Sequence, residues 1–161
     1  MRKITILLIE NDIEHCNKYA EYVKTQGNKY VLKISHGIRQ GLKLVQSQKF
    51  NTILLDLEIN KNDGDGNGIN FLIELQKFRL NYHPFIIVIT NSVSDLTHAK
   101  AREFGADFIF TKDKIDYSPE MVIGFSEMFF NSPTQAQKSF EPRDVKNLVE
   151  KDIEINSGAN G

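Results

Sequence analysis

The sequence has little cysteine, no tryptophan and no surplus of charge of either sign. A single cysteine, Cys16, excludes an intramolecular disulfide framework. The 20 basic and 21 acidic residues leave a net charge of −1, so no basic field indicates binding to nucleic acid or an anionic membrane. No apolar run approaches the length of a membrane span, and the first, over 4–9, is too short for a secretory signal. We therefore expect a cytoplasmic protein that binds neither nucleic acid nor membrane.

Short apolar runs alternate with longer amphipathic segments. The short runs predict strands over 4–9, 30–35, 51–56, 85–90 and 107–111. The first, third and fourth are nearly continuous in apolar residues, as expected for central strands, and the second and fifth are weaker, as edge strands tend to be. The longer segments predict helices at about 12–27, 37–48, 68–81, 95–104 and 118–130. Cys16 falls on the buried stripe of the first helix, and Ser94 offers an N-cap for the fourth. Strict alternation of strand and helix favours a parallel sheet with right-handed crossovers. We predict an α/β fold of the flavodoxin-like, doubly wound kind, a five-stranded parallel sheet in the order 2-1-3-4-5 with helices on both faces.

The composition of the chain changes near residue 130. Asn131, Ser132 and Pro133 interrupt the pattern, and the residues up to Ser139 are polar. A short helical pattern follows Pro142, and the last five residues are typical of disorder. We predict one domain over 1–130 and a tail or linker over 131–161 that contains at most one short helix.

Polar residues stand where four of the predicted strands end. Glu10, Asn11 and Asp12 follow the first strand and Asp56 closes the third. Thr90 closes the fourth strand, and Lys112 follows the fifth. The carboxyl ends of parallel strands lie at one edge of the sheet, so these side chains should share a cleft. Carboxylates beside a hydroxyl and an ammonium suit phosphoryl transfer to an aspartate, because a divalent ion and the ammonium can offset the charge.

The chain resembles the receiver domain of two-component response regulators over roughly residues 3–130. The matching segments are ITILLIEND, TILLDLEI, FIIVITNSVSD and GADFIFTK. The resemblance implies that Asp56 is the phosphoacceptor. It also implies Mg²⁺ as cofactor, with Glu10 and Asn11 at the acidic-pair positions, Asp12 as a substitute ligand, and Asp56 and the backbone carbonyl of Glu58 completing the site.

The same resemblance implies roles for two further side chains and for partners. Thr90 and Lys112 would contact the phosphoryl oxygens. A histidine kinase or a phosphotransfer protein would donate the phosphoryl group. The acyl phosphate would then direct the face formed by the fourth helix, fifth strand and fifth helix toward an effector or a second copy of the chain.

The sequence departs from the receiver pattern at several positions. Asn11 stands where a second carboxylate is usual, and Ile109 replaces an aromatic residue three positions before the lysine. Asp113 replaces the proline that usually follows Lys112, and the loop after Asp56 is longer than usual. These departures leave open an alternative, a pseudo-receiver that binds a partner without phosphorylation.

The loop after the third strand also fits a calcium-binding pattern. Asp63, Asp65, Asn67 and Glu74 stand at the ligand positions of an EF-hand loop, with Gly68 at the turn. A strand rather than a helix precedes this loop, and no second loop of the kind exists. A turn rich in glycine, asparagine and aspartate is the simpler interpretation.

Two further functional classes fit less well. Asp56-Leu57-Glu58 is similar to the start of haloacid-dehalogenase-type phosphatases, but those place the nucleophile after the first strand and need a second aspartate where Glu58 stands. Nucleotide binding is disfavoured, because the turn after the first strand has no glycine and carries acidic residues. The four histidines show no metal-ligand spacing, and we expect surface or capping roles for them.

Overall fold

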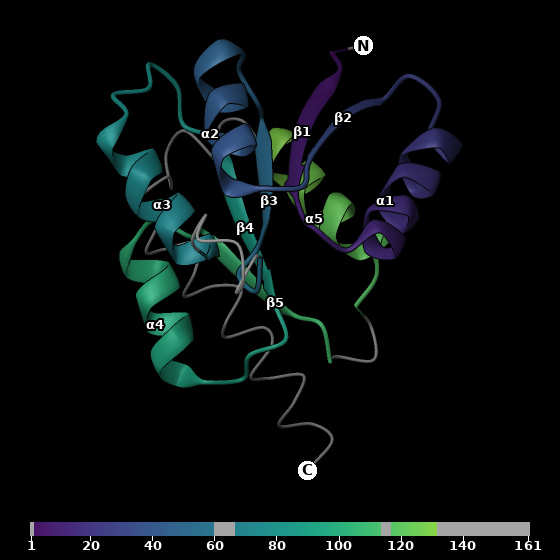
Figure 1. Ribbon diagram of the computed structural model, residues 1–161. Helices are drawn as coiled ribbons and strands as arrows, with labels where there is room; N and C mark the ends of the chain where they lie inside the picture. Colours follow the sequence, from purple (N-terminus) through teal and green to yellow (C-terminus); the bar gives the residue numbers. More distant parts are fainter. Residues whose placement is uncertain (1, 60–66, 114–116, 132–161) are drawn as a thin grey trace.

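Five strands and five helices alternate along the residues that the computed structural model describes, 2–59, 67–113 and 117–131 (Figure 1). The strands are β1 (Ile4–Ile9), β2 (Tyr30–Ser35), β3 (Thr52–Asp56), β4 (Phe85–Thr90) and β5 (Phe108–Thr111). The helices are α1 (Ile13–Thr25), α2 (Ile38–Ser47), α3 (Gly68–Lys77), α4 (Asp95–Glu103) and α5 (Pro119–Asn131).

All neighbouring strands are parallel, and their order is β2-β1-β3-β4-β5. The predicted fold class and strand order are therefore confirmed. β1, β3 and β4 are the central strands, and β3 and β4 are buried along their whole length. β2 and β5 lie at the edges, as their weaker apolar patterns indicated.

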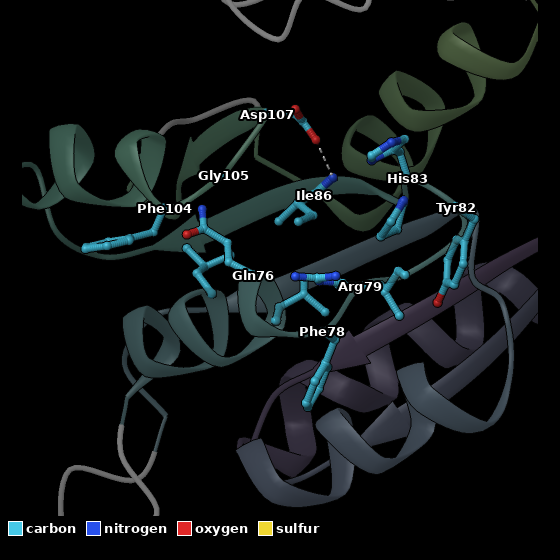
Figure 2. Close-up of a pocket in the computed structure, with 13 residues that line it drawn as sticks. Gln76, Phe78, Arg79, Tyr82, His83, Ile86, Phe104, Gly105 and Asp107 are labelled. Carbon is cyan, nitrogen blue, oxygen red and sulfur yellow. Dashed lines mark hydrogen bonds between the residues drawn. The ribbon is translucent and has the colours of Figure 1, made fainter.

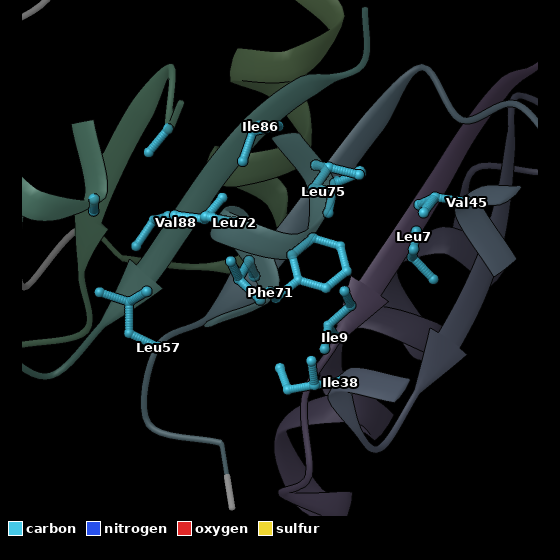
Figure 3. Close-up of a cluster of buried hydrophobic side chains, with 14 of the residues drawn as sticks. Leu7, Ile9, Ile38, Val45, Leu57, Phe71, Leu72, Leu75, Ile86 and Val88 are labelled. Atoms are coloured by element: carbon cyan, nitrogen blue, oxygen red, sulfur yellow. The ribbon is translucent and has the colours of Figure 1, made fainter. Parts of the chain in front are cut away.

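Alternate residues of the central strands face two separate cores. On one face Leu7, Ile53 and Val88 pack against α2, α3 and α4, with Phe71 of α3 at the centre of the cluster (Figure 3). On the other face Leu54 and Ile87 join a cluster that includes side chains of α1 and α5. The helices thus cover both faces of the sheet (Figure 1). The carboxyl ends of its parallel strands lie at one edge.

Polar side chains cap the starts of two helices that leave this edge, α1 and α4. Asp12 accepts a hydrogen bond from the backbone N–H of His15 at the start of α1. Ser94 does the same for Thr97 at the start of α4, as its place in the sequence indicated.

One helix is shorter than the sequence predicts. α3 ends at Lys77 rather than at 81, because Phe78 adopts an extended backbone conformation. The side chains of Phe78 and Leu80 then pack on the edge of the core from extended chain. Tertiary packing thus overrides a helical pattern in the sequence.

The last described helix, α5, ends at Asn131, and the domain over 1–130 with a tail over 131–161 stays a prediction. The short helix expected after Pro142 lies outside the described residues, so it stays a prediction. Among the described helices, none has the length and apolar character needed to cross a bilayer.

Candidate functional site

The carboxyl edge of the sheet brings Glu10, Asp56, Thr90 and Lys112 together. Ile9 lies opposite Leu55 and Asp56 opposite Ile89, so the residues that close these strands are neighbours. Glu10, Asp56 and Thr90 are only 1%, 4% and 0% exposed. Carboxylates are rarely buried in this way without a partner or a function.

Lys112 is the cation that faces both buried carboxylates. Its Nζ lies 3.2 Å from Oδ2 of Asp56 and 3.6 Å from Oε1 of Glu10. The other oxygen of Asp56, Oδ1, accepts a hydrogen bond of 3.0 Å from the backbone N–H of Glu58. Both oxygens of Asp56 therefore have a donor, but one ammonium faces two carboxylates.

This shortage of positive charge is reflected in the pKa values. Burial, and after it the carboxylate of Glu10, raises the pKa of Asp56. Burial also opposes ionisation of Glu10, but hydrogen bonding from His15, together with Asp56 and Lys112, lowers the pKa of Glu10 overall. The site thus holds Glu10 as a carboxylate and makes the charge of Asp56 costly.

The side chain of Glu58 turns toward the end of β4. Its Oε1 accepts a hydrogen bond from the hydroxyl of Thr90 and from the backbone N–H groups of Asn91 and Ser92, the last two at 2.8 and 3.1 Å. Burial, followed by the neighbouring Asp56, raises the pKa of Glu58. The sequence suggested a role only for the backbone carbonyl of this residue, and nothing in the local pattern indicated where its carboxylate would lie.

His15 departs from the surface role expected for the histidines. Its Nδ1 lies 2.7 Å from Oε1 of Glu10, and its Nε2 lies 2.6 Å from the hydroxyl of Tyr117. The hydroxyl of Tyr117 also lies 2.8 Å from that of the fully buried Tyr19. These three hydrogen bonds can form in series with a neutral imidazole: Tyr19 donates to Tyr117, Tyr117 donates to Nε2 of His15, and Nδ1 of His15 donates to Glu10.

Cys16 is buried, as its place on α1 suggested, and its thiol donates to the backbone oxygen of Glu10. Burial, followed by the charges of Glu10 and Asp12, raises the pKa of its thiol to about 11. The thiolate is the nucleophilic form of cysteine, so this side chain does not act as a nucleophile at neutral pH.

The oxygen-rich edge fits a hard divalent cation. Oε2 of Glu10 and Oε2 of Glu58 are buried and have no hydrogen-bond partner among the described residues. Within that part of the chain no three histidine, cysteine, aspartate or glutamate side chains form a ready metal cluster. Mg²⁺ commonly uses only one or two carboxylates and completes its shell with other oxygens, so the residues present fit this ion.

The two residues expected to complete a magnesium site lie at the start of α1. Asn11 and Asp12 are both exposed at this edge. One oxygen of Asp12 is already engaged as the cap of α1. This cap competes with the predicted role of Asp12 as a substitute ligand.

The calcium pattern is only partly within the described residues. Asp63 and Asp65 lie outside them. Asn67 caps α3 by accepting from the backbone N–H of Asn70, and Glu74 lies in α3, where it pairs with Lys77 at 2.7 Å. The two ligand candidates that are described thus already have partners within α3.

A pocket of about 450 Å³ lies away from this site (Figure 2). It is lined by the end of α3, the segment before β4 and the turn before β5, where Gln76, Arg79 and Phe104 face it. Asp107 on its wall accepts a hydrogen bond of 2.9 Å from the backbone N–H of Ile86. These residues belong to the amino edge of the sheet, so the pocket shares no residue with the polar site.

The sequence matches the response regulator receiver domain family over residues 6–117. The fold is similar to a CheY-like response regulator receiver domain protein from Methanospirillum hungatei JF-1, at 19% identity over 85% of this chain and 99% of that chain, with a TM-score of 0.67. It is similar to a Burkholderia pseudomallei response regulator with a phosphorylated aspartic acid, calcium ion and citrate. The identity is 24% over 86% of this chain and 75% of that chain, with a TM-score of 0.64. It is also similar to the Mn²⁺-bound form of the response regulator Rcp1, at 23% identity over 75% of this chain and 90% of that chain, with a TM-score of 0.62.

Proposed function

Because the chain belongs to the response regulator receiver domain family, we propose that it is a phosphorylation-dependent switch whose phosphoacceptor is Asp56. The observation that carries the proposal is the position of this carboxylate, buried at the carboxyl edge of the sheet with the ammonium of Lys112 3.2 Å away. A buried carboxylate with a raised pKa and a specific cation partner is typical of a functional site.

In the proposed reaction one oxygen of Asp56 attacks the phosphorus of the donor. A P–O bond to the carboxylate forms while the bond between phosphorus and the donor breaks, and the donor keeps the electron pair. Lys112 offsets negative charge on the phosphoryl oxygens, and Thr90 donates its hydroxyl hydrogen to one of them. The protein thus contributes position and charge, which is most of what phosphoryl transfer requires.

We assign the cofactor as Mg²⁺, held by Glu10, Asp56 and the backbone carbonyl of Glu58, with Asn11 or Asp12 completing the protein ligands. When bound, the ion would neutralise carboxylate and phosphoryl charge at this edge. The buried carboxylate oxygen Oε2 of Glu10, which has no hydrogen-bond partner among the described residues, supports this assignment.

The proposed donor is a histidine kinase or a phosphotransfer protein, in the cytoplasm. The proposed output is a change at the face formed by α4, β5 and α5, which would bind an effector or a second copy. Exposed apolar side chains support a contact surface there: Val93 and Leu96 at the start of α4 are 68% and 67% exposed, and Met128 of α5 is 66% exposed.

A pseudo-receiver is the second candidate function. The contact between Thr90 and Glu58 favours it, because the hydroxyl proposed to bind a phosphoryl oxygen already has an anionic partner. Asn11 favours it as well, since an amide replaces one carboxylate beside the metal position. Such a module would bind its partner without phosphorylation.

Intact mass after incubation with acetyl phosphate and Mg²⁺ tests the proposal. We expect one added phosphoryl group on the wild type and none on Asp56→Asn. The exposed Asp113→Asn, at the same edge, is the matched control and should be phosphorylated like the wild type. Lack of an adduct on the wild type, together with no response to beryllofluoride, would contradict the switch and favour the pseudo-receiver.

A further inference from the structure

The carboxylate of Glu58 is bound as an oxyanion would be. A hydroxyl and two backbone N–H groups, from Thr90, Asn91 and Ser92, converge on its Oε1. Donors arranged in this way stabilise a negatively charged oxygen, and a hydrogen bond to a carboxylate is stronger than one between neutral groups. The end of β4 therefore forms an anion-binding position that Glu58 fills.

The orientation of Thr90 follows from the same contacts. Its Oγ1 accepts a hydrogen bond of 3.0 Å from the backbone N–H of Ser92, so the single hydroxyl hydrogen remains for Glu58. A threonine hydroxyl has one hydrogen to donate, so Thr90 cannot serve Glu58 and a phosphoryl oxygen together. The two anions compete for one donor.

Charge strengthens this competition. Glu10 and Asp56 already place two carboxylates beside Lys112. Glu58 adds a third carboxylate, next to Asp56, so a phosphoryl group that approaches Asp56 meets an occupied and negatively charged position. Since like charges in a partly buried site repel strongly, Glu58 opposes entry of the phosphoryl group unless it turns away.

We infer that the Glu58 carboxylate occupies, before phosphorylation, the position that a phosphoryl oxygen takes afterwards, and that it must leave for Asp56 to be phosphorylated. The inference rests on the proposed function and deepens it. Glu58 is then a positioning residue with two effects. It slows the reaction with phosphodonors, and it keeps Thr90 directed into the site while the protein is unphosphorylated.

The rate of adduct formation with acetyl phosphate and Mg²⁺, followed by intact mass, measures the first effect. Glu58→Ala empties the position and Glu58→Gln keeps its shape without the charge. We expect the second-order rate constant to rise about tenfold or more in Glu58→Ala, as for loss of one nearby like charge, and less in Glu58→Gln. The control Glu103→Gln removes an exposed carboxylate from α4 and should leave the rate unchanged.

The amide resonances of Asn91 and Ser92 measure the second effect without any reaction. In unphosphorylated protein without Mg²⁺, Glu58→Ala should shift both resonances, because each N–H loses its carboxylate acceptor. Beryllofluoride with Mg²⁺ should return them toward their wild-type positions, since a new anion then fills the site. The same spectra report whether each variant is folded.

The outcomes separate this inference from the proposed function. Equal rates of adduct formation in the wild type and Glu58→Ala, with unchanged amide resonances, would overturn the inference alone. An adduct on Glu58→Ala but not on the wild type would support it most strongly. No adduct on any variant, nor any response to beryllofluoride, would overturn the proposed function and this inference with it.

Discussion

The hydroxyl of Tyr117 lies 2.6 Å from Nε2 of His15, a residue 102 positions earlier in the chain. This contact links Glu10 at the polar site to the segment that leads into α5. His15 holds Glu10 on one side and Tyr117 on the other, and Tyr117 also meets the buried Tyr19 of α1. The network therefore fastens α1 to the start of α5 next to Asp56, the proposed phosphoacceptor.

We expect Tyr117→Phe to lower the free energy of unfolding by about 1–3 kcal/mol, because the buried hydroxyl of Tyr19 and Nε2 of His15 lose their partner. Urea denaturation measures this loss. Tyr22→Phe removes a hydroxyl from α1 that has no hydrogen bond among the described residues, so it should cost far less. Equal losses in the two variants would contradict a structural role for the network.

Gly68 allows α3 to start directly against the end of β3. A Cβ at this position would lie 2.7 Å from the backbone oxygen of Asp56 and 2.7 Å from Cα of Leu57. Both are backbone atoms, so the contact cannot be relieved by a side-chain rotation. We expect Gly68→Ala to cost about 1–3 kcal/mol of stability through overpacking and to slow phosphorylation by displacing Asp56.

Gly124→Ala is the matched control for this substitution. A Cβ at Gly124 of α5 would meet nothing within 4 Å. Alanine is favoured over glycine inside a helix, so we expect a gain of roughly 0.5–1 kcal/mol. Thermal or urea denaturation measures the stability of both variants. If Gly68→Ala were as stable as Gly124→Ala, the close packing of Gly68 against the backbone of Asp56 and Leu57 would not require glycine.

The fold could be predicted from the sequence because its signals are local. Near-continuous apolar runs identified β1, β3 and β4 as central strands, and the weaker runs identified β2 and β5 as edges. Caps such as Ser94 fixed helix starts within a residue. Asp56 and Lys112 were brought together by topology, since parallel strands end at one edge.

The side-chain contacts of Glu58 and His15 could not be predicted in the same way. Glu58 stands two residues after Asp56, but its direction depends on the donors offered by the end of β4. His15 and Tyr117 meet only because α1 and the segment before α5 cover the same face of the sheet. A single sequence carries no periodic signal for such contacts, so these functional candidates emerged from the folded structure alone.

The raised pKa of Asp56 predicts how stability depends on pH. Burial and the charge of Glu10 mean that folded Asp56 binds its proton more tightly than unfolded Asp56 does. Ionisation therefore destabilises the folded state above the folded pKa, and this cost disappears as pH falls below the ordinary value of 3.8. We expect Asp56→Asn to be more stable than the wild type at pH 8 without Mg²⁺.

This gain should shrink as pH falls from the raised folded pKa toward the ordinary value, because the wild-type carboxyl then becomes neutral as well. Melting temperatures of both proteins across this range provide the measurement. The partners of the carboxylate are Glu10, Glu58 and Lys112, and loss of the contact to Lys112 works against the gain. A difference that stays constant with pH would show that ionisation of Asp56 is not its cause.

Asn11 should limit the affinity for Mg²⁺. As a proposed ligand it would contribute an amide oxygen where a carboxylate would add a full charge, and Mg²⁺ prefers hard, charged oxygen ligands. We expect Asn11→Asp to bind Mg²⁺ about tenfold more tightly, which corresponds to about 1.4 kcal/mol, as measured by calorimetry or by the rise of melting temperature with Mg²⁺. Asn17→Asp adds the same charge at an exposed position of α1 and serves as the control. Because long-range attraction would help both variants equally, only a gain confined to Asn11→Asp supports direct ligation at this position.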